Sequence, residues 1–411
     1  MTASRIRDSS KGIKNESFAL FMLNLSILTT VVLQFFIESG IYPLLRISLY
    51  LIFILTLLSI ISANPSFTRN SFLNFYTIVI YLSVIFFLLI SFFKSELILG
   101  ALIEFAMPFV ILYMGFKSNA NRNQMSKLIL RYMISVTVLG VFVVFFYGSG
   151  FQISGQYYFS SKNQVGPFIA SVAMVSLISF FGRSYKTNLI INKNVLIIIF
   201  IINIASLLAL RNRSGIVALG VCLLVFLLSK IKMKKRFNKG ILLMPITIIV
   251  LSTIVINTNI FDPVVDTLYR SFFLNYDTSD LNSLSAGRAD VYMNVLQFLK
   301  TSPFFGELYL SSNIFETPHN YLLNSWLNYG LLGVLPITIF YIYLWVFVIF
   351  KIVIKKKHDL SLYLILFMVV ISIFEYTYPF GPLTTVSISW LLLGYYLKNN
   401  NNSTRLDQTA K

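Results

Sequence analysis

The sequence predicts an all-α integral membrane protein: a polytopic bundle of about twelve transmembrane helices with one long extracytoplasmic loop that contains short helices. Hydrophobic residues make up 57% of the 411 residues and charged residues only 12%, whereas about 25% of a typical soluble domain is charged. A helix needs about 20 apolar residues to cross a bilayer, and runs of this kind recur along almost the whole chain. We therefore expect a single membrane domain over residues 1–411.

Twelve apolar segments are long enough, or nearly so, to form transmembrane helices. The N-terminal tail has no small-residue cleavage site and leads directly into the first of them, so we expect it to be retained. The single cysteine, Cys222, excludes an internal disulfide. The predicted spans cover residues 17–37, 41–62, 72–93, 97–116, 128–147, 164–181, 195–210, 214–229, 241–261, 331–354, 360–376 and 382–397.

The distribution of Lys and Arg predicts the orientation of these spans. Twelve spans place both termini on one side, which carries 23 of the 33 basic residues, while the other side carries 7. The positive-inside rule therefore predicts that both termini are cytoplasmic. This orientation accounts for most of the net charge of +18, so we expect no nucleic-acid partner. The cytoplasmic connections are also too short for a nucleotide-binding domain.

Residues 262–330, between the ninth and tenth spans, form the one long polar segment and are expected to be an extracytoplasmic loop with amphipathic helices. Loops longer than about 15 residues are usually either functional or disordered. Ser285 can cap a helix that has Arg288 in its first turn and Tyr292, Val295 and Leu299 on one face. This loop is the predicted location of the chemistry.

The second predicted helix of the loop carries one of only two histidines in the chain. Thr317 would be its N-cap, Pro318 its first residue, His319 the next, and Gly330 its end. The positive end of a helix dipole disfavours a histidine cation, so we expect His319 to be neutral and able to accept a proton. A lone histidine is usually structural, and only its neighbours make His319 a catalytic candidate.

Two arginines, Arg211 and Arg213, lie in the tight outer turn LRNRSG, residues 210–215. They are on the side that the positive-inside rule disfavours, which suggests an anionic partner; the alternatives are snorkelling or a misassigned topology. A guanidinium binds phosphate oxygens bidentately. Together with Arg288, this turn suits a diphosphate.

Other ionisable residues lie within or near the predicted spans and are candidates for structural or functional roles. Arg46 and Glu104 lie at a similar depth and could form a buried pair. Glu375 lies near the outer end of the eleventh span, at the depth of His319, and is either an ion-pair scaffold or part of a site. The second histidine, His358, lies in a short KKKHD segment that we expect to be cytoplasmic and unimportant for activity.

The chain has no Gly-rich phosphate loop, no paired histidines for a metal and no Gly-x-Ser-x-Gly turn. We therefore expect neither metal nor cofactor.

Four segments together carry a family resemblance. They are SSKNQVGPFIA (160–170), RNRSGIVAL (211–219), AGRADVYMNVLQFLKTSPFFG (286–306) and PHNYLLNSWLNYGLLG (318–333). The ensemble resembles the bacterial O-antigen ligase and O-antigen or capsule polymerase superfamily of membrane glycosyltransferases. Where that family has one arginine, this chain has both Arg211 and Arg213.

The resemblance implies an inverting hexosyltransferase of surface polysaccharide biosynthesis, either lipopolysaccharide O-antigen or capsule. Its donor and acceptor would be glycans linked to undecaprenyl diphosphate, at the outer face of the bacterial cytoplasmic (inner) membrane. Membrane lipid, a flippase and a chain-length regulator are the further partners that this role implies. The implied site residues are His319 as base, with Asp290 or Glu316 in reserve, Arg288 with Arg211 or Arg213 for the diphosphate, and Asn320 and Glu375 in support.

Three functions remain open at this stage. We favour a polymerase over a ligase, because nothing in the sequence indicates a fixed site for a core oligosaccharide. A transporter or flippase should show internal repeats and ionisable groups at mid-membrane. In this chain the ionisable groups gather at the predicted outer face instead, which favours an enzyme.

Overall fold

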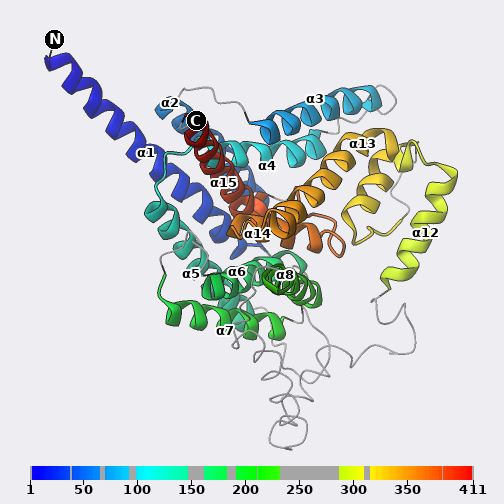
Figure 1. Cartoon of the computed structure of the whole chain (residues 1–411). Helices are drawn as coiled ribbons and strands as arrows, with labels where there is room; N and C mark the ends of the chain where they lie inside the picture. The colour runs from blue at the N-terminus through cyan, green and yellow to red at the C-terminus, as the bar shows by residue number, and fades with distance from the viewer. Residues whose placement is uncertain are drawn as a thin grey trace, which may run out of the picture.

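The computed structural model of the chain describes residues 2–37, 39–64, 70–91, 99–146, 162–182, 191–210, 212–231, 287–309, 315–381 and 383–409. Within these ranges every regular element is helical (Figure 1). The all-α prediction is therefore confirmed for the part of the chain that the structure describes.

Eleven of the twelve predicted spans coincide with a helix. The predicted span 241–261 and the first part of the long loop lie outside the described residues. In chain order the elements are α1 (Thr2–Gln34), α2 (Tyr42–Ala63), α3 (Ser71–Ser91), α4 (Leu99–Lys117), α5 (Arg122–Phe146), α6 (Lys162–Gly182), α7 (Lys193–Ala209), α8 (Arg213–Ile231), α12 (Arg288–Thr301), the 3-10 turn η3 (Gly306–Tyr309), α13 (Tyr321–Ile349), the π-helical turn η4 (Phe350–Ile354), α14 (Leu360–Ile371) and α15 (Leu383–Thr409).

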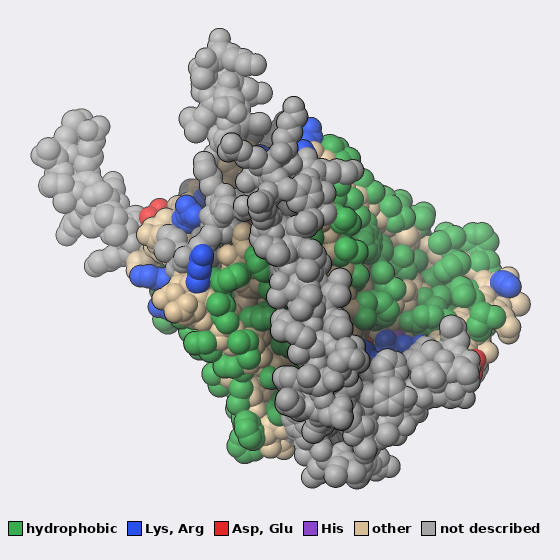
Figure 2. Space-filling view, turned by 60° about the horizontal axis from the view of Figure 1, so that its bottom comes forward, with side chains coloured by type: hydrophobic (Ala, Val, Ile, Leu, Met, Phe, Trp, Pro, Cys, Tyr) green, Lys and Arg blue, Asp and Glu red, His purple; other side chains and the backbone are tan. Residues whose placement is uncertain are grey.

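The outer surface of the helical bundle is apolar, as a lipid-embedded protein requires. Among the described residues, six helices are long and apolar enough to cross a membrane, and four shorter apolar helices accompany them. Figure 2 shows a broad face of hydrophobic side chains. Large apolar residues that are each more than half exposed include Phe21, Leu44, Tyr81 and Val346. The chain is thus an integral membrane protein of several spans, and the count of twelve stays a prediction.

Helix α14 lies at the centre of the bundle. All twelve of its residues are buried, and it packs against α6, α8, α13 and α15. A helix that is apolar on every side belongs either in a protein core or in lipid, and the burial of all twelve residues places α14 in the core. The predicted span 360–376 was too long, because the helix ends at Ile371 and residues 372–381 form mainly turns.

Glycines bring α4 and α15 into backbone contact. A Cβ atom at Gly115 would overlap the carbonyl of Leu391, and one at Gly394 would overlap the carbonyl of Leu112. Small residues that let two backbones approach closely are a usual means of helix association in lipid. This contact fixes α15 beside α4.

The segment directly after α12, residues 302–309, docks on a kink in α13. Gly330, with φ 64° and ψ 173°, interrupts α13 where the sequence predicted a helix end. Gly306, with φ 56°, approaches the α13 backbone so closely that a Cβ would overlap the carbonyl of Leu327. Across this contact, the Trp326 indole nitrogen donates to Pro303 O at 2.7 Å. The kink therefore holds α12 against the N-terminal part of α13.

Helix α13 begins three residues later than predicted. Its N-cap is Asn320, whose side chain accepts a hydrogen bond from Leu323 N at 3.0 Å, so Thr317 is not the cap. Both residue types are good caps, and a tertiary contact selects between them, because Tyr321 N donates to Ser372 O at 2.9 Å. The prediction that His319 lies in the first helical turn is wrong: His319 directly precedes the cap.

Candidate functional site

A buried carboxylate, Glu375, lies where four elements meet. It is 3% exposed, in the turn that follows α14. One oxygen, Oε1, lies 3.4 Å from Arg288 Nη2 and accepts a hydrogen bond from Ser214 Oγ at 3.3 Å. The other oxygen, Oε2, lies 3.5 Å from His319 Nδ1. A buried carboxylate is costly unless it is paired, so these three partners account for its position.

Arg288 is the first residue of α12 and faces the end of α14. Its Nη1 atom donates to Phe374 O at 2.8 Å while Nη2 faces Glu375. The last carbonyls of a helix have no partner inside the helix and carry partial negative charge, so this position favours a cation. The side chain is 25% exposed, which leaves the guanidinium within reach of a ligand.

His319 is accessible on one side and faces Glu375 on the other. Its side chain is 36% exposed, and its ring lies edge to face with Tyr376, with 6.1 Å between the centroids. Although Nδ1 is within ion-pair distance of Glu375, it makes no hydrogen bond among the described residues. The contact is therefore an ion pair only when the imidazole is protonated.

Tyr292 fixes the backbone at His319. Its hydroxyl donates to His319 O at 2.7 Å. Burial raises the pKa of Tyr292, nearby Arg288 lowers it in part, and Glu375 raises it further. The phenol consequently keeps its proton throughout the neutral range and remains a donor.

The first residues of α13 bind the same end of α14. Asn320 Nδ2 donates to Ile373 O at 3.3 Å, in addition to the hydrogen bond between Tyr321 N and Ser372 O. Together with Arg288, these donors satisfy three consecutive carbonyls beyond α14. Irregular backbone at membrane depth is stable only where protein satisfies it, which explains why α14 can end early.

The start of α8 joins the site through Ser214. Arg213, the first residue of α8, is half-buried and directly precedes Ser214, whereas Arg211 lies outside the described residues. Of the two arginines predicted for the diphosphate, the structure therefore positions Arg213 next to a residue that contacts Glu375.

Asn212 ties the start of α8 to α6. It is 2% exposed, and its side chain accepts from Gly215 N at 2.8 Å. A Cβ atom at Gly166 in α6 would overlap the Asn212 side chain. Two of the segments that carry the family resemblance, 160–170 and 211–219, thus pack on each other through a glycine and an asparagine.

Residues 198–338 match the family model described as O-antigen ligase. The predicted resemblance is confirmed for this segment. It runs from α7 into α13 and includes Arg213, Arg288 and His319, while Glu375 lies beyond it. No curated protein matches the chain. The match supports a function of the O-antigen ligase or polymerase type.

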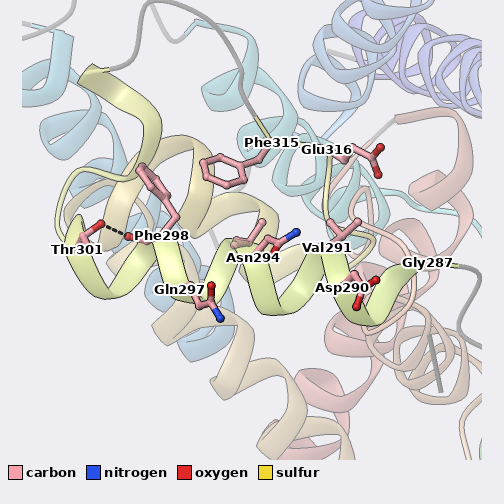
Figure 3. Close-up of a pocket in the computed structure, with 10 residues that line it drawn as sticks. Gly287, Asp290, Val291, Asn294, Gln297, Phe298, Thr301, Phe315 and Glu316 are labelled. Atoms are coloured by element: carbon pink, nitrogen blue, oxygen red, sulfur yellow. Dashed lines mark hydrogen bonds between the residues drawn. The ribbon is translucent and has the colours of Figure 1, made fainter. Parts of the chain in front are cut away.

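The two reserve candidates for the base are Asp290 and Glu316. Both are exposed, and both line a cavity of about 800 Å³ along α12 (Figure 3). Within the described part of the chain, no group of three or more His, Cys, Asp or Glu residues is arranged to hold a metal ion.

The sequence missed two side chains of this site. Ser214 follows Arg213 directly, and this position next to a candidate arginine is the feature of the sequence that could have indicated a site residue. Tyr292 is one helical turn after Arg288, so the spacing places both residues on one face of the helix. The sequence suggested only that Tyr292 packs on this face with its apolar neighbours. The predicted Arg46–Glu104 pair involves a Glu104 side chain that lies outside the described residues.

His358 is less peripheral than the sequence suggested. It is 9% exposed, its Nδ1 is 2.8 Å from the Tyr363 hydroxyl, and its ring packs edge to face with Phe226. A substitution at His358 would therefore disturb packing, which makes it unsuitable as a neutral control for His319.

Proposed function

We propose that the chain is a membrane glycosyltransferase that polymerises polyprenyl-diphosphate-linked oligosaccharide units into surface polysaccharide at the outer face of the cytoplasmic membrane. The observation that carries the proposal is the contact of one buried carboxylate, Glu375, with both an arginine and an accessible histidine. Arg288 and His319 belong to the segment that matches the O-antigen ligase family.

The proposed reaction is a single displacement at the anomeric carbon of the donor. The acceptor hydroxyl oxygen forms the new bond to this carbon, and its proton passes to His319. The bond from the anomeric carbon to the phosphate oxygen breaks, and the diphosphate leaves with the electron pair. Displacement from the opposite face inverts the anomeric configuration.

Each step of this displacement has a residue suited to it. Sugar hydroxyls ionise far above neutral pH, so a base contributes typically about 10² to 10⁴ in rate, and His319 has an exposed side on which to meet the hydroxyl. The leaving diphosphate gains negative charge, and the planar guanidinium groups of Arg288 and of Arg213 or Arg211 would bind it through paired donors.

Glu375 would act on His319 rather than on the substrate. When His319 takes the acceptor proton, the carboxylate 3.5 Å from Nδ1 faces an imidazolium. A buried carboxylate that orients a base and stabilises its cation is the arrangement of a catalytic triad. Glu375 is therefore proposed as a positioning residue, and its contact with Arg288 couples the base to the diphosphate site.

The alternative function is an O-antigen ligase, which the description of the matched family favours. The two activities differ in the acceptor: a second lipid-linked unit for a polymerase, and the lipid A core for a ligase. Both functions imply a protein of the cytoplasmic membrane. We propose in addition that both termini are cytoplasmic and that a flippase and a chain-length regulator are partners of the protein.

Purified protein with a defined lipid-linked repeat unit as the only substrate tests this proposal. A polymerase converts the unit into lipid-linked dimers and longer products and releases polyprenyl diphosphate. A ligase leaves the unit unchanged until lipid A core is added and then transfers the glycan to it. Absence of transfer to either acceptor would contradict glycosyl transfer by this chain.

A further inference from the structure

Helix α12 presents three distinct faces, and only one belongs to the site described above. Arg288, Tyr292, Val295 and Leu299 form the inward face: the first two contact the Glu375 region, and the last two are buried against α13. A second face holds the exposed residues Met293, Leu296 and Lys300. The third face lines the cavity of about 800 Å³.

The cavity face of α12 carries a row of polar side chains. Asp290, Asn294, Gln297 and Thr301 recur at intervals of three or four residues, so they follow one another along one edge of the helix. All four are exposed, and Figure 3 shows them spaced along the length of the helix. The two amides and the hydroxyl can both donate and accept hydrogen bonds, and the carboxylate accepts them.

The other edge of the cavity is aromatic and apolar. Val291 and Phe298 line it from α12, and Phe315 lines it from the segment before α13. The rings of Phe298 and Phe315 lie 4.8 Å apart and tilted to each other. Figure 3 shows this pair and Val291 on the side of α12 nearest the 315–316 segment. Glu316 completes this wall.

The chemistry of these two edges matches sugars rather than phosphates. A pyranose has a rim of hydroxyl groups, which suits carboxylates and amides, and flat C–H faces, which pack on aromatic rings. The residues described around the cavity include two carboxylates and neither Lys nor Arg, so a diphosphate would be repelled. The volume is within the usual range of ligand pockets, about 300 to 1,000 Å³.

We propose that this cavity binds consecutive sugar residues of the lipid-linked glycan, so that α12 holds the diphosphate on one face and the glycan on another. The inference rests on the proposed function and extends it to the substrate's sugar chain. The lining begins at Gly287, beside Arg288, and ends at Thr301, a length of about 20 Å at 1.5 Å per residue. A glycan with its reacting end at His319 would therefore lie along the helix over several sugars.

A binding measurement without lipid or diphosphate tests the glycan site. The probe is a fluorescently labelled free oligosaccharide, prepared by partial acid hydrolysis of the host's own surface polysaccharide, and its anisotropy is measured with the purified full-length protein. The double variant Asn294→Ala/Gln297→Ala should bind the probe roughly tenfold or more weakly than wild type, because two side-chain hydrogen-bonding groups are lost. Lys300→Gln, on the exposed face of the same helix, should bind normally.

Variants at the Glu375 site separate this inference from the proposed function. Arg288→Lys and His319→Gln should lose transfer activity and still bind the probe as wild type does. Normal probe binding by a wild-type protein that transfers no glycan would contradict the proposed function and leave the sugar site intact. Failure of the wild type to bind, normal binding by the double variant, or displacement of the probe by inorganic pyrophosphate would each overturn the sugar site.

The same probe distinguishes the two substrates that carry sugars. In an active reaction, a labelled oligosaccharide that becomes lengthened occupies the place of the acceptor glycan. A labelled oligosaccharide that inhibits transfer and keeps its length occupies the place of the donor glycan. Either result supports a sugar site along α12.

Discussion

At the scale of single residues, the site depends on one carboxylate with several partners. Glu375 is buried, and its two oxygens face Arg288, Ser214 and His319. Removing one partner of a buried charge leaves the other uncompensated. The role of Glu375 can therefore be separated from simple scaffolding by changing its charge while its size is kept.

We expect Glu375→Gln to lower kcat by roughly 10²-fold, because the amide cannot stabilise a protonated His319. Glu375→Asp, which keeps the charge on a shorter side chain, should retain more activity than the amide. The effect is measured as the rate of glycan transfer by purified protein. The comparison uses variants whose midpoints of thermal unfolding equal that of wild type. A Glu375→Gln protein with kcat within twofold of wild type would show that the carboxylate is only structural.

The arginines allow a test in which charge is conserved. Arg288→Lys and one of the two variants Arg211→Lys and Arg213→Lys should each lose more than about tenfold in activity, because a lysine has no planar fork for a diphosphate. Comparing Arg211→Lys with Arg213→Lys identifies which of the two neighbouring arginines takes part. Lys300→Gln, an exposed position on α12, is the control for expression and insertion. Full activity in all three arginine variants would refute the diphosphate clamp.

The sequence predicted Arg288 and His319 as candidates because both lie in the one long polar segment and sit close to helix starts. It could not decide whether Glu375 belongs to the site. Apolar runs and caps are local patterns, whereas the contacts of Glu375 join residues far apart in the chain through the early end of α14. The position at which α14 ends depends on hydrogen-bond donors from the starts of α12 and α13. Local sequence patterns carry no information about such contacts.

At the scale of elements, hydrophobic periodicity predicted α12 well and the start of α13 less well. Val295 and Leu299 are buried on the predicted face. For α13, two good caps compete within four residues, and the contact with Ser372 decides in favour of Asn320. The break at Gly330 was predicted, because glycine readily adopts the positive φ found there.

The kink at Gly330 leads to a stability prediction. Gly330→Ala should lower the free energy of unfolding by about 1 to 3 kcal/mol or more, because φ 64° with ψ 173° is essentially restricted to glycine and the new Cβ would overlap Phe304 O. Gly220→Ala is the matched control, since that glycine lies within α8 with open space around it, where alanine favours the helix. Thermal unfolding in detergent measures both, and equal midpoints for the two variants would contradict the role of the kink.

At the scale of the whole molecule, hydropathy predicted the bundle because lipid admits few alternatives to apolar helices. The hydropathy pattern overestimated the length of α14. This helix is surrounded by other helices rather than by lipid, so it can be short. In Figure 1, α1 begins and α15 ends on the side of the molecule away from α12. This arrangement agrees with the predicted separation of the termini from the long loop.

The predicted orientation can be tested directly with reporter fusions. A fusion after Lys239 should be active only with a cytoplasmic reporter, and a fusion near Asp280 only with an external one, because basic residues concentrate on the cytoplasmic side. An external signal after Lys239, or a cytoplasmic one near Asp280, would reverse the orientation and remove the site from the outer face.

The measurement that tests the central claim most directly is the initial rate of glycan transfer by purified His319→Gln. Glutamine can donate and accept hydrogen bonds, but it cannot take a proton at neutral pH, so it preserves a structural role and removes a base. If His319 is the general base, the rate should fall by about 10² to 10⁴ while binding of the lipid-linked donor stays at the wild-type level. A wild-type rate in His319→Gln would contradict the account and move the base to Asp290 or Glu316.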